Sequence, residues 1–107
     1  MADLPTLTDD NFDSTLQTSD QPVLVDFSAT WCQPCKALAP KIEKVADEFE
    51  GQLKVFSVDI EDAQSAVSQL GIQGVPTCVF FKSGREVDRI QGDQDINSLR
   101  ERVNKVL

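Results

Sequence analysis

Hydrophobic residues occur along the chain in two patterns, short continuous runs and stripes with a spacing of three or four positions. The runs contain many β-branched and aromatic residues, which is typical of strands. They cover residues 22–28, 53–60, 77–81 and 86–90. The stripes predict helices, and they begin after Thr8, after Pro34, at Ala63 and at Ile96. This order of elements predicts an α/β fold with a mixed sheet and helices on both faces.

Short polar and glycine-containing segments separate these elements and indicate where each begins. The expected N-cap residues, whose side chains would accept hydrogen bonds from the first helical amides, are Thr8, Asp62 and either Asp93 or Asp95. Asp9 and Asp10 follow Thr8, at the positive end of the first helix dipole. Ser83-Gly84 predicts a two-residue turn, so the last two strands are expected to form an antiparallel hairpin.

The composition is that of an ordinary soluble domain. The chain has 107 residues, of which 40% are hydrophobic and 26% charged, and this favours a single domain spanning residues 1–107. A formal net charge of -8 argues against binding to nucleic acid or to anionic lipid surfaces. The first residues show no basic segment followed by an apolar run, and no apolar run approaches the length of a membrane span, so we expect a cytoplasmic protein without a membrane segment. A monomer is the default expectation for an acidic single domain.

Two cysteines stand three residues apart in the stretch ATWCQPCK. Cys32 follows the end of the first predicted strand, and Cys35 lies in the first turn of the next helix, where Pro34 is well tolerated. A structural zinc site would need four ligands, but the chain has no histidine and only one other cysteine. A structural disulfide across so short a loop would constrain the unfolded chain very little. A reactive redox pair is therefore the favoured interpretation.

The start of the helix makes the two thiols unequal. Cys32 would lie where the helix dipole and free amides favour a thiolate, and Lys36 would add a small favourable field. Cys35 would lie one turn deeper and keep a higher pKa. This asymmetry makes Cys32 the expected nucleophile and Cys35 the expected resolving thiol.

Two further residues stand out because they lie in otherwise hydrophobic runs. Asp26 interrupts the first strand, and burial should raise its pKa. It is either a buried acid that caps a hydrogen-bond network or a general base for the reactive pair. Cys78 should face the same side of the sheet as Pro76. It is a small buried hydrophobe, a regulatory thiol or a partner for Cys35.

The segments VDFSATWCQPCK and GVPT, followed by Gly84 and Gly92, resemble the thioredoxin family, and the resemblance covers essentially the whole chain. Trp-Cys-Gln-Pro-Cys stands where the family usually has Trp-Cys-Gly-Pro-Cys, so Gln33 is the departure within the motif. Glutamine is a better helix former than glycine, so Gln33 should stiffen the first turn and change the redox potential only modestly. The resemblance implies the thioredoxin fold, with a central mixed five-stranded sheet flanked by four helices.

The resemblance implies a protein disulfide reductase that contributes to cell redox homeostasis. Cys32 would attack a target disulfide and Cys35 would release the reduced target, leaving a Cys32-Cys35 disulfide. The residue that matches Asp26 is implicated in moving the proton of the resolving cysteine through water. No cofactor would be bound, and a thioredoxin reductase would supply electrons, either from NADPH through its flavin or as a ferredoxin-linked enzyme. The expected partners are disulfide-containing target proteins and this reductase.

The resemblance also implies a groove for an extended target segment, formed by Trp31, Gly74, Val75, Pro76 and Gly92. The Val75-Pro76 bond would be cis, and the backbone of Val75 would be free to pair with the target as an added strand would. Core packing is the alternative role for the side chain of Val75.

Besides Gln33, four positions outside the motif depart from the family pattern. Ser28 stands where many bacterial members have tryptophan, and Ser57 stands where many have a lysine close to the buried acid. Gln91 and Asp93 flank Gly92 where small or apolar residues are common, which indicates either a preference for polar or basic targets or a solvated rim. The alternative functions are an oxidase or isomerase of the same fold and a redox-silent binding subunit.

Overall fold

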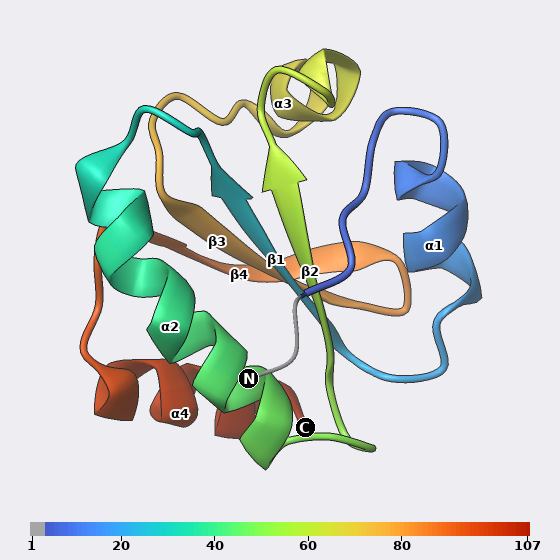
Figure 1. The fold of residues 1–107 in the computed structure, drawn as a ribbon. Helices are drawn as coiled ribbons and strands as arrows, with labels where there is room; N and C mark the ends of the chain where they lie inside the picture. Colours follow the sequence, from blue (N-terminus) through green and yellow to red (C-terminus); the bar gives the residue numbers. More distant parts are fainter. Residues whose placement is uncertain (1–3) are drawn as a thin grey trace.

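The computed structural model describes residues 4–107, which form a mixed sheet with helices on both faces (Figure 1). The elements follow one another in the order α1 (Phe12–Thr18), β1 (Val23–Ser28), α2 (Gln33–Glu48), β2 (Lys54–Asp59), α3 (Gln64–Leu70), β3 (Thr77–Lys82), β4 (Arg85–Gln91) and α4 (Ile96–Val106). The α/β class and the order of elements expected from the hydrophobic pattern are therefore confirmed.

The sheet has four strands in the order β2-β1-β3-β4. β1 pairs in parallel with β2 and antiparallel with β3, and β3 pairs antiparallel with β4. The expectation of five strands is wrong, because the described segment before α1 contributes only an isolated parallel bridge between Thr6 and Ser57. Pro5 has no amide to donate, and the amide of Thr8 bonds to the side chain of Asn11 instead of continuing the ladder.

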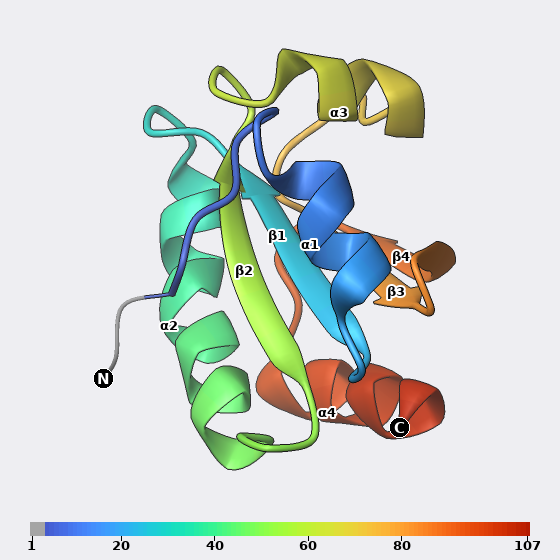
Figure 2. The same cartoon turned by 90° about the vertical axis from the view of Figure 1, so that its right-hand side faces the viewer.

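Alternation along β1 sends its side chains into two separate cores. Val23, Val25 and Phe27 pack with residues of α1 and α3, whereas Leu24 packs with residues of α2 and α4. Figure 2 shows the sheet from the side, with α2 on one side of β1 and β2 and α1 on the other. Asp26 lies two positions after Leu24 and is therefore on the α2 face of the sheet.

The turn between β3 and β4 is the predicted two-residue hairpin. Lys82 pairs with Arg85 across the turn, and Ser83 and Gly84 have positive φ values of 54° and 78°. Glycine adopts this backbone region without steric cost, which explains the use of Gly84. The hairpin leaves β4 at one edge of the sheet.

The caps of α1 and α4 were only partly predicted. α1 begins at Phe12 with Asn11 at the N-cap, so the prediction of Thr8 as its cap is wrong. The cap predicted at Asp95 is confirmed, since its carboxylate accepts the amide of Ser98 at 2.9 Å.

The cap of α3 comes from a distant part of the chain. Ala63 stands at the N-cap, so the prediction that Asp62 caps this helix is wrong. The carboxylate of Asp9 instead accepts hydrogen bonds from the amides of Ser65 and Ala66, both at 3.0 Å. Asp9 therefore acts at the positive end of α3 rather than of α1, and it joins the loop before α1 to α3.

Replacing Asp9 with alanine should lower the free energy of unfolding by about 1 to 2 kcal/mol, because two amides at the start of α3 lose a charged acceptor. Urea unfolding followed by circular dichroism would measure the change. Asp10→Ala is the matched control, since Asp10 is the neighbouring acidic residue and is exposed. Equal stability of the two variants would contradict the role of Asp9.

Candidate active site

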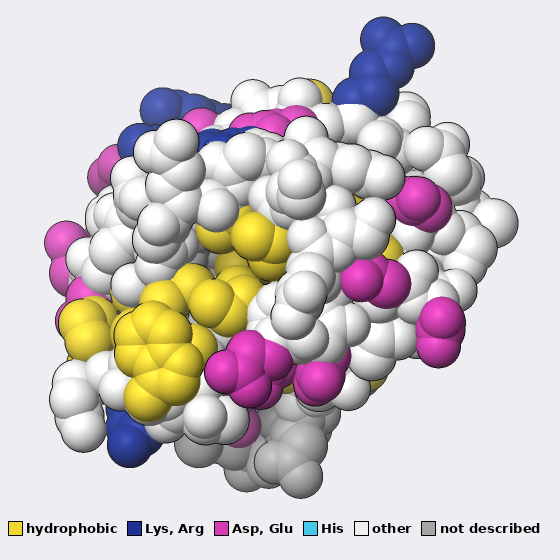
Figure 3. All heavy atoms as spheres, turned by 90° about the horizontal axis from the view of Figure 1, so that it is seen from above, with side chains coloured by type: hydrophobic (Ala, Val, Ile, Leu, Met, Phe, Trp, Pro, Cys, Tyr) yellow, Lys and Arg dark blue, Asp and Glu magenta, His cyan; other side chains and the backbone are white. Residues whose placement is uncertain are grey.

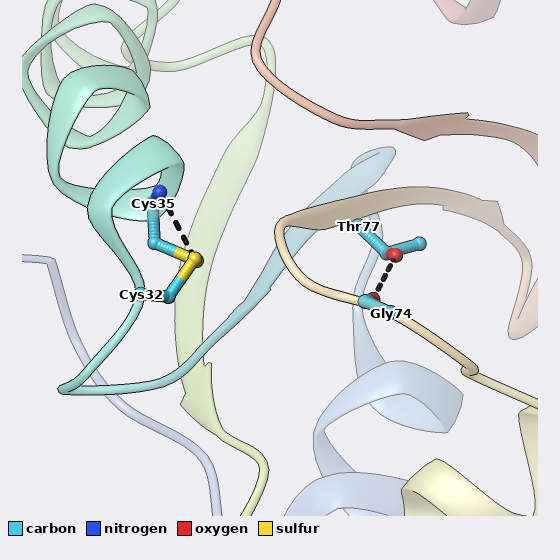
Figure 4. Close-up of a disulfide and its surroundings, with 4 residues drawn as sticks. All are labelled: Cys32, Cys35, Gly74 and Thr77. Atoms are coloured by element: carbon cyan, nitrogen blue, oxygen red, sulfur yellow. Dashed lines mark hydrogen bonds between the residues drawn. A yellow bond between two sulfur atoms is a disulfide. The ribbon is translucent and has the colours of Figure 1, made fainter.

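A disulfide joins Cys32 and Cys35 at the start of α2 (Figure 4). Cys32 occupies the N-cap position, where its sulfur accepts a hydrogen bond from the amide of Cys35 at 3.2 Å. The two Cα atoms are 5.3 Å apart, and each residue is 4% exposed. The pair therefore lies where helix amides and the helix dipole favour negative charge on the sulfur of Cys32.

The segment from Gly74 to Thr77 lies beside the cysteine pair. Its Val75-Pro76 peptide bond is cis, and Val75 packs against the cluster that contains both cysteines. The hydroxyl of Thr77 donates to the carbonyl of Gly74 at 2.6 Å (Figure 4), and the amide of Gly92 donates to the carbonyl of Pro76 at 2.8 Å. The first bond is made within the segment, and the second attaches it to the residue that follows β4, so together they fix its backbone. Thr77 is not among the predicted site residues, although the motif GVPT contains it.

An apolar groove opens next to this segment. It has a volume of about 130 Å³, and its lining consists of Trp31, Ile60, Val67, Ile72, Gln73, Gly74 and Val75. Trp31 is 65% exposed, which is unusual for so large an apolar side chain. Figure 3 shows hydrophobic side chains gathered in a hollow on the end of the molecule seen from above, with acidic side chains beside them. We call these seven lining residues the apolar groove.

The apolar groove contains only part of the predicted groove. Trp31, Gly74 and Val75 line it, whereas Pro76 and Gly92 lie outside its lining. The lining residues that were not predicted are Ile60, Val67, Ile72 and Gln73. Apolar residues within and on both sides of α3 were the available signal, but in the sequence they could not be distinguished from residues of the core.

Asp26 is buried on the α2 face of β1. It is 4% exposed, and burial raises its pKa from 3.8 to about 7. No hydrogen bond from residues 4–107 reaches its Oδ1 atom, so the interpretation as the cap of a hydrogen-bond network has no support. Asp26 and Cys35 line the same pocket, whose volume is about 240 Å³. A carboxyl group that titrates near neutral pH therefore shares a pocket with one of the two reactive cysteines.

Cys78 is a free thiol in the core. It lies directly opposite Asp26 in the ladder between β1 and β3, and it is 1% exposed. Burial, and to a smaller extent the charge of Asp26, raise its pKa well above the ordinary thiol value. Cys78 therefore has the surroundings of a small buried hydrophobe rather than those of a reactive thiol.

The other predicted residues near the pair lie on the surface. Gln33, Pro34 and Lys36 are exposed in the first turn of α2. Asp93 forms an ion pair with Lys41 at 3.0 Å, which reduces the negative charge that Asp93 offers to a basic target.

Within residues 4–107, no group of three or more histidine, cysteine, aspartate or glutamate side chains is arranged to hold a metal ion. None of the described helices combines the length and the apolar character needed to cross a membrane.

Comparison with known proteins agrees with this geometry. The family model described as Thioredoxin matches residues 3–105. The chain is 39% identical over 101 residues to Thioredoxin 1 of Nostoc sp., covering 94% of each chain. It is 41% identical over 99 residues to the thioredoxin of Rickettsia felis, covering 92% of this chain and 94% of the relative. The chain belongs to the thioredoxin family, and it is a thiol-disulfide oxidoreductase with Cys32 and Cys35 as its redox pair.

Proposed function

We propose that the protein reduces disulfides in other proteins, with Cys32 as the nucleophile and Cys35 as the resolving thiol. The observation that carries this proposal is the hydrogen bond of 3.2 Å from the Cys35 amide to the Cys32 sulfur. An amide donor at a helix start stabilises a thiolate at Cys32, and the thiolate is the form that attacks a disulfide. The adjacent apolar groove offers a surface on which a target can bind.

The reaction consists of two exchanges. The thiolate of Cys32 forms a bond with one sulfur of the target disulfide, and the other target sulfur leaves as a thiolate and takes up a proton. The thiolate of Cys35 then attacks the sulfur of Cys32, which breaks the mixed disulfide and releases the second target thiolate. The target gains two electrons and two protons, while Cys32 and Cys35 are oxidised to the disulfide seen in the structure.

Asp26 is suited to take the proton of Cys35 before the second exchange. Its pKa of about 7 is close to neutral pH, where a general base is most effective. The pocket that Asp26 shares with Cys35 has a volume of about 240 Å³, which is enough for a water molecule that carries the proton between them.

A target segment would bind in extended form along the apolar groove. No backbone hydrogen bond within the described part of the chain involves Val75, so its amide and carbonyl can pair with the target. Trp31 would cover the target's apolar side chains. Gly74, Pro76 and Gly92 would position the backbone of Val75 through the hydrogen bonds described above.

The residues of the first turn of α2 would adjust the reactivity of Cys32 and the surface around the cysteine pair. Lys36 would add a favourable field for the thiolate of Cys32. Gln33 and Pro34 are exposed and would shape the surface that the target meets.

Members of this family work without a bound cofactor, so electrons have to come from a partner protein. We propose a thioredoxin reductase as this partner, either a flavin enzyme that uses NADPH or a ferredoxin-linked enzyme. We expect one domain over residues 1–107 that acts as a monomer in the cytoplasm.

Replacing Cys35 with serine should trap the first exchange. Cys32 would still attack a target disulfide, but no thiol would resolve the product, so a covalent complex with insulin should accumulate. Nonreducing electrophoresis would detect the complex, and mass spectrometry would locate the link at Cys32. The control variant with both Cys32 and Cys35 replaced by serine should form no complex. A link at Cys78, or equal trapping by Cys32→Ser, would contradict the assigned roles.

A further inference from the structure

The loop of residues 92–95 connects β4 to α4 and lies against the segment that contains the cis bond. The amide of Gly92 donates to the carbonyl of Pro76 at 2.8 Å. The side chain of Gln91, the last residue of β4, lies against Gly74, where a Cβ atom would be only 3.1 Å from its Nε2 atom. Gly74 lines the apolar groove. The end of β4 and the loop 92–95 therefore form an edge of the surface proposed for targets.

Lys41 attaches this loop to α2, the helix that begins at the cysteine pair. Its ammonium group donates to the carboxylate of Asp93 at 3.0 Å and to the carbonyl of Gln94 at 2.9 Å. The side chains of Lys41 and Asp93 are 33% and 36% exposed. An ion pair with this exposure contributes little to folding stability. Its main consequence is local, because a cation held by two bonds neutralises the carboxylate that directly follows Gly92.

The other charged groups of this region leave Asp93 as the carboxylate nearest to Gly92 in the chain. Asp95 accepts a hydrogen bond from an amide in the first turn of α4 and acts as the cap of that helix. Lys44 lines a surface pocket together with Lys41 and Asp95, but it is exposed and lies one turn further from the cysteine pair. A target at the edge formed by the loop 92–95 would therefore meet the charge of Asp93 first.

The protein as a whole disfavours acidic targets. Its formal net charge is -8, and Figure 3 shows acidic side chains beside the hollow that contains the hydrophobic side chains. A carboxylate at Asp93 without its cation would add a negative charge close to the target, where a charge has a larger effect than at a distance. Lys41 removes this additional repulsion.

We propose that Lys41 is a specificity-determining residue, which allows target disulfides with acidic neighbours to react because it neutralises Asp93 at the edge of the target surface. The inference rests on the proposed reduction of protein disulfides by Cys32 and Cys35, and it names one class of target for that reaction. Lys41 and Asp93 exchange no electrons or protons with the target. Their substitution should change the preference among targets and leave the chemistry of the cysteine pair unchanged.

Two synthetic peptides with the same disulfide test this role, one with glutamates and the other with lysines on both sides of the disulfide. The reduced protein is mixed with an excess of each peptide at low ionic strength, quenched with acid and analysed by chromatography. The charge preference is the rate with the lysine peptide divided by the rate with the glutamate peptide. Lys41→Met keeps an unbranched apolar side chain without the cation, and it should raise the charge preference about fivefold. Sodium chloride at about 1 M should remove most of this increase.

Three further variants separate the local charge from other effects. Lys41→Arg keeps the cation and should leave the charge preference within about twofold of the wild-type value. Lys41→Met combined with Asp93→Asn removes both charges and should restore the wild-type preference. Lys82→Met removes the same charge at the far end of β3, which begins at Thr77, and should change the preference less than about twofold. Circular dichroism would confirm folding, and the rate with neutral bis(2-hydroxyethyl) disulfide should be the same for all variants.

An equal charge preference in Lys41→Met and Lys82→Met would overturn the inference. An increase that Asp93→Asn does not remove, or an equal loss of rate with both peptides, would also overturn it, since either result would assign Lys41 a purely structural role. A wild-type protein that reduces neither peptide would contradict the proposed function. A wild-type protein that reduces both, with a preference independent of Lys41, would contradict this inference alone.

Discussion

Replacing Cys32 with serine is expected to lower the reduction of insulin by dithiothreitol to the rate of dithiothreitol alone. A serine hydroxyl does not ionise near neutral pH and forms no disulfide, so the first exchange loses its nucleophile. Cys35 is not expected to replace it, because the helix amide in this turn donates to the sulfur of Cys32. The turbidity of precipitating insulin chains, followed over time, would measure the rate.

Cys78→Ala is the control for this experiment. Cys78 is a free thiol that is 1% exposed, so its removal should leave the rate of insulin reduction within about twofold of the wild-type rate. A Cys32→Ser variant that keeps more than about a tenth of the wild-type rate would show that another group carries the first exchange.

The parts of the site that could be predicted are those encoded by neighbouring residues. Cys32 and Cys35 are three positions apart at a strand-to-helix boundary, and local geometry alone brings them together. Asp26 was noticeable because one carboxylate interrupts an otherwise hydrophobic strand, and its burial and raised pKa follow from that position. The cis bond before Pro76 was expected only from the family resemblance, because most bonds before proline are trans.

The parts that could not be predicted depend on contacts between distant segments. Asp9 looked like a residue of the first helix terminus, but its carboxylate binds the amides of Ser65 and Ala66 in α3. The part of the apolar groove around α3 escaped prediction for the same reason, since Ile60 and Ile72 lie on either side of α3 and meet Trp31 only in the folded chain. Periodicity indicates that a residue is apolar and faces inward, but it does not say which segment lies opposite.

The number of strands was overestimated because it came from the family resemblance rather than from the residues. No hydrophobic run before Phe12 predicts a strand, and residues 4–11 form only a single bridge, between Thr6 and Ser57. The hydrophobic runs alone predict the four strands that are found.

Replacing Asp26 with alanine is expected to stabilise the protein by about 2 to 4 kcal/mol at pH 8. Burial raises the pKa of Asp26 from 3.8 to about 7, so ionising it is harder in the folded protein than in the unfolded chain. The full shift corresponds to about 4 kcal/mol, and the small cavity left by the substitution offsets part of it.

The pH dependence of this stabilisation identifies its cause. Below about pH 4 the carboxyl is protonated in both states, so Asp26 costs the folded protein nothing and alanine should give no gain. Between about pH 4 and 7 only the unfolded chain ionises, so the stability of the wild-type protein falls as pH rises; above about 7 the difference stays constant. Urea unfolding of the oxidised proteins across this range would measure it, with Asp10→Ala as the exposed control. An equal gain at pH 4 and pH 8 would attribute the effect to packing instead of ionisation.

The same substitution should slow the reduction of insulin at pH 7 by about ten- to a hundredfold, because the resolving thiol loses its general base. In the wild-type protein the release of a trapped target from Cys32 should become faster as pH rises through about 7, following the ionisation of Asp26. In Asp26→Ala this rise should move to the higher pH at which Cys35 ionises without help. Rapid-mixing measurements of target release across this pH range would show the shift. A variant that is more stable but keeps the wild-type rate and pH profile would make Asp26 a buried acid without a part in catalysis. A variant that is more stable, slower and shifted in its pH profile is the result expected if the carboxyl exchanges a proton with Cys35.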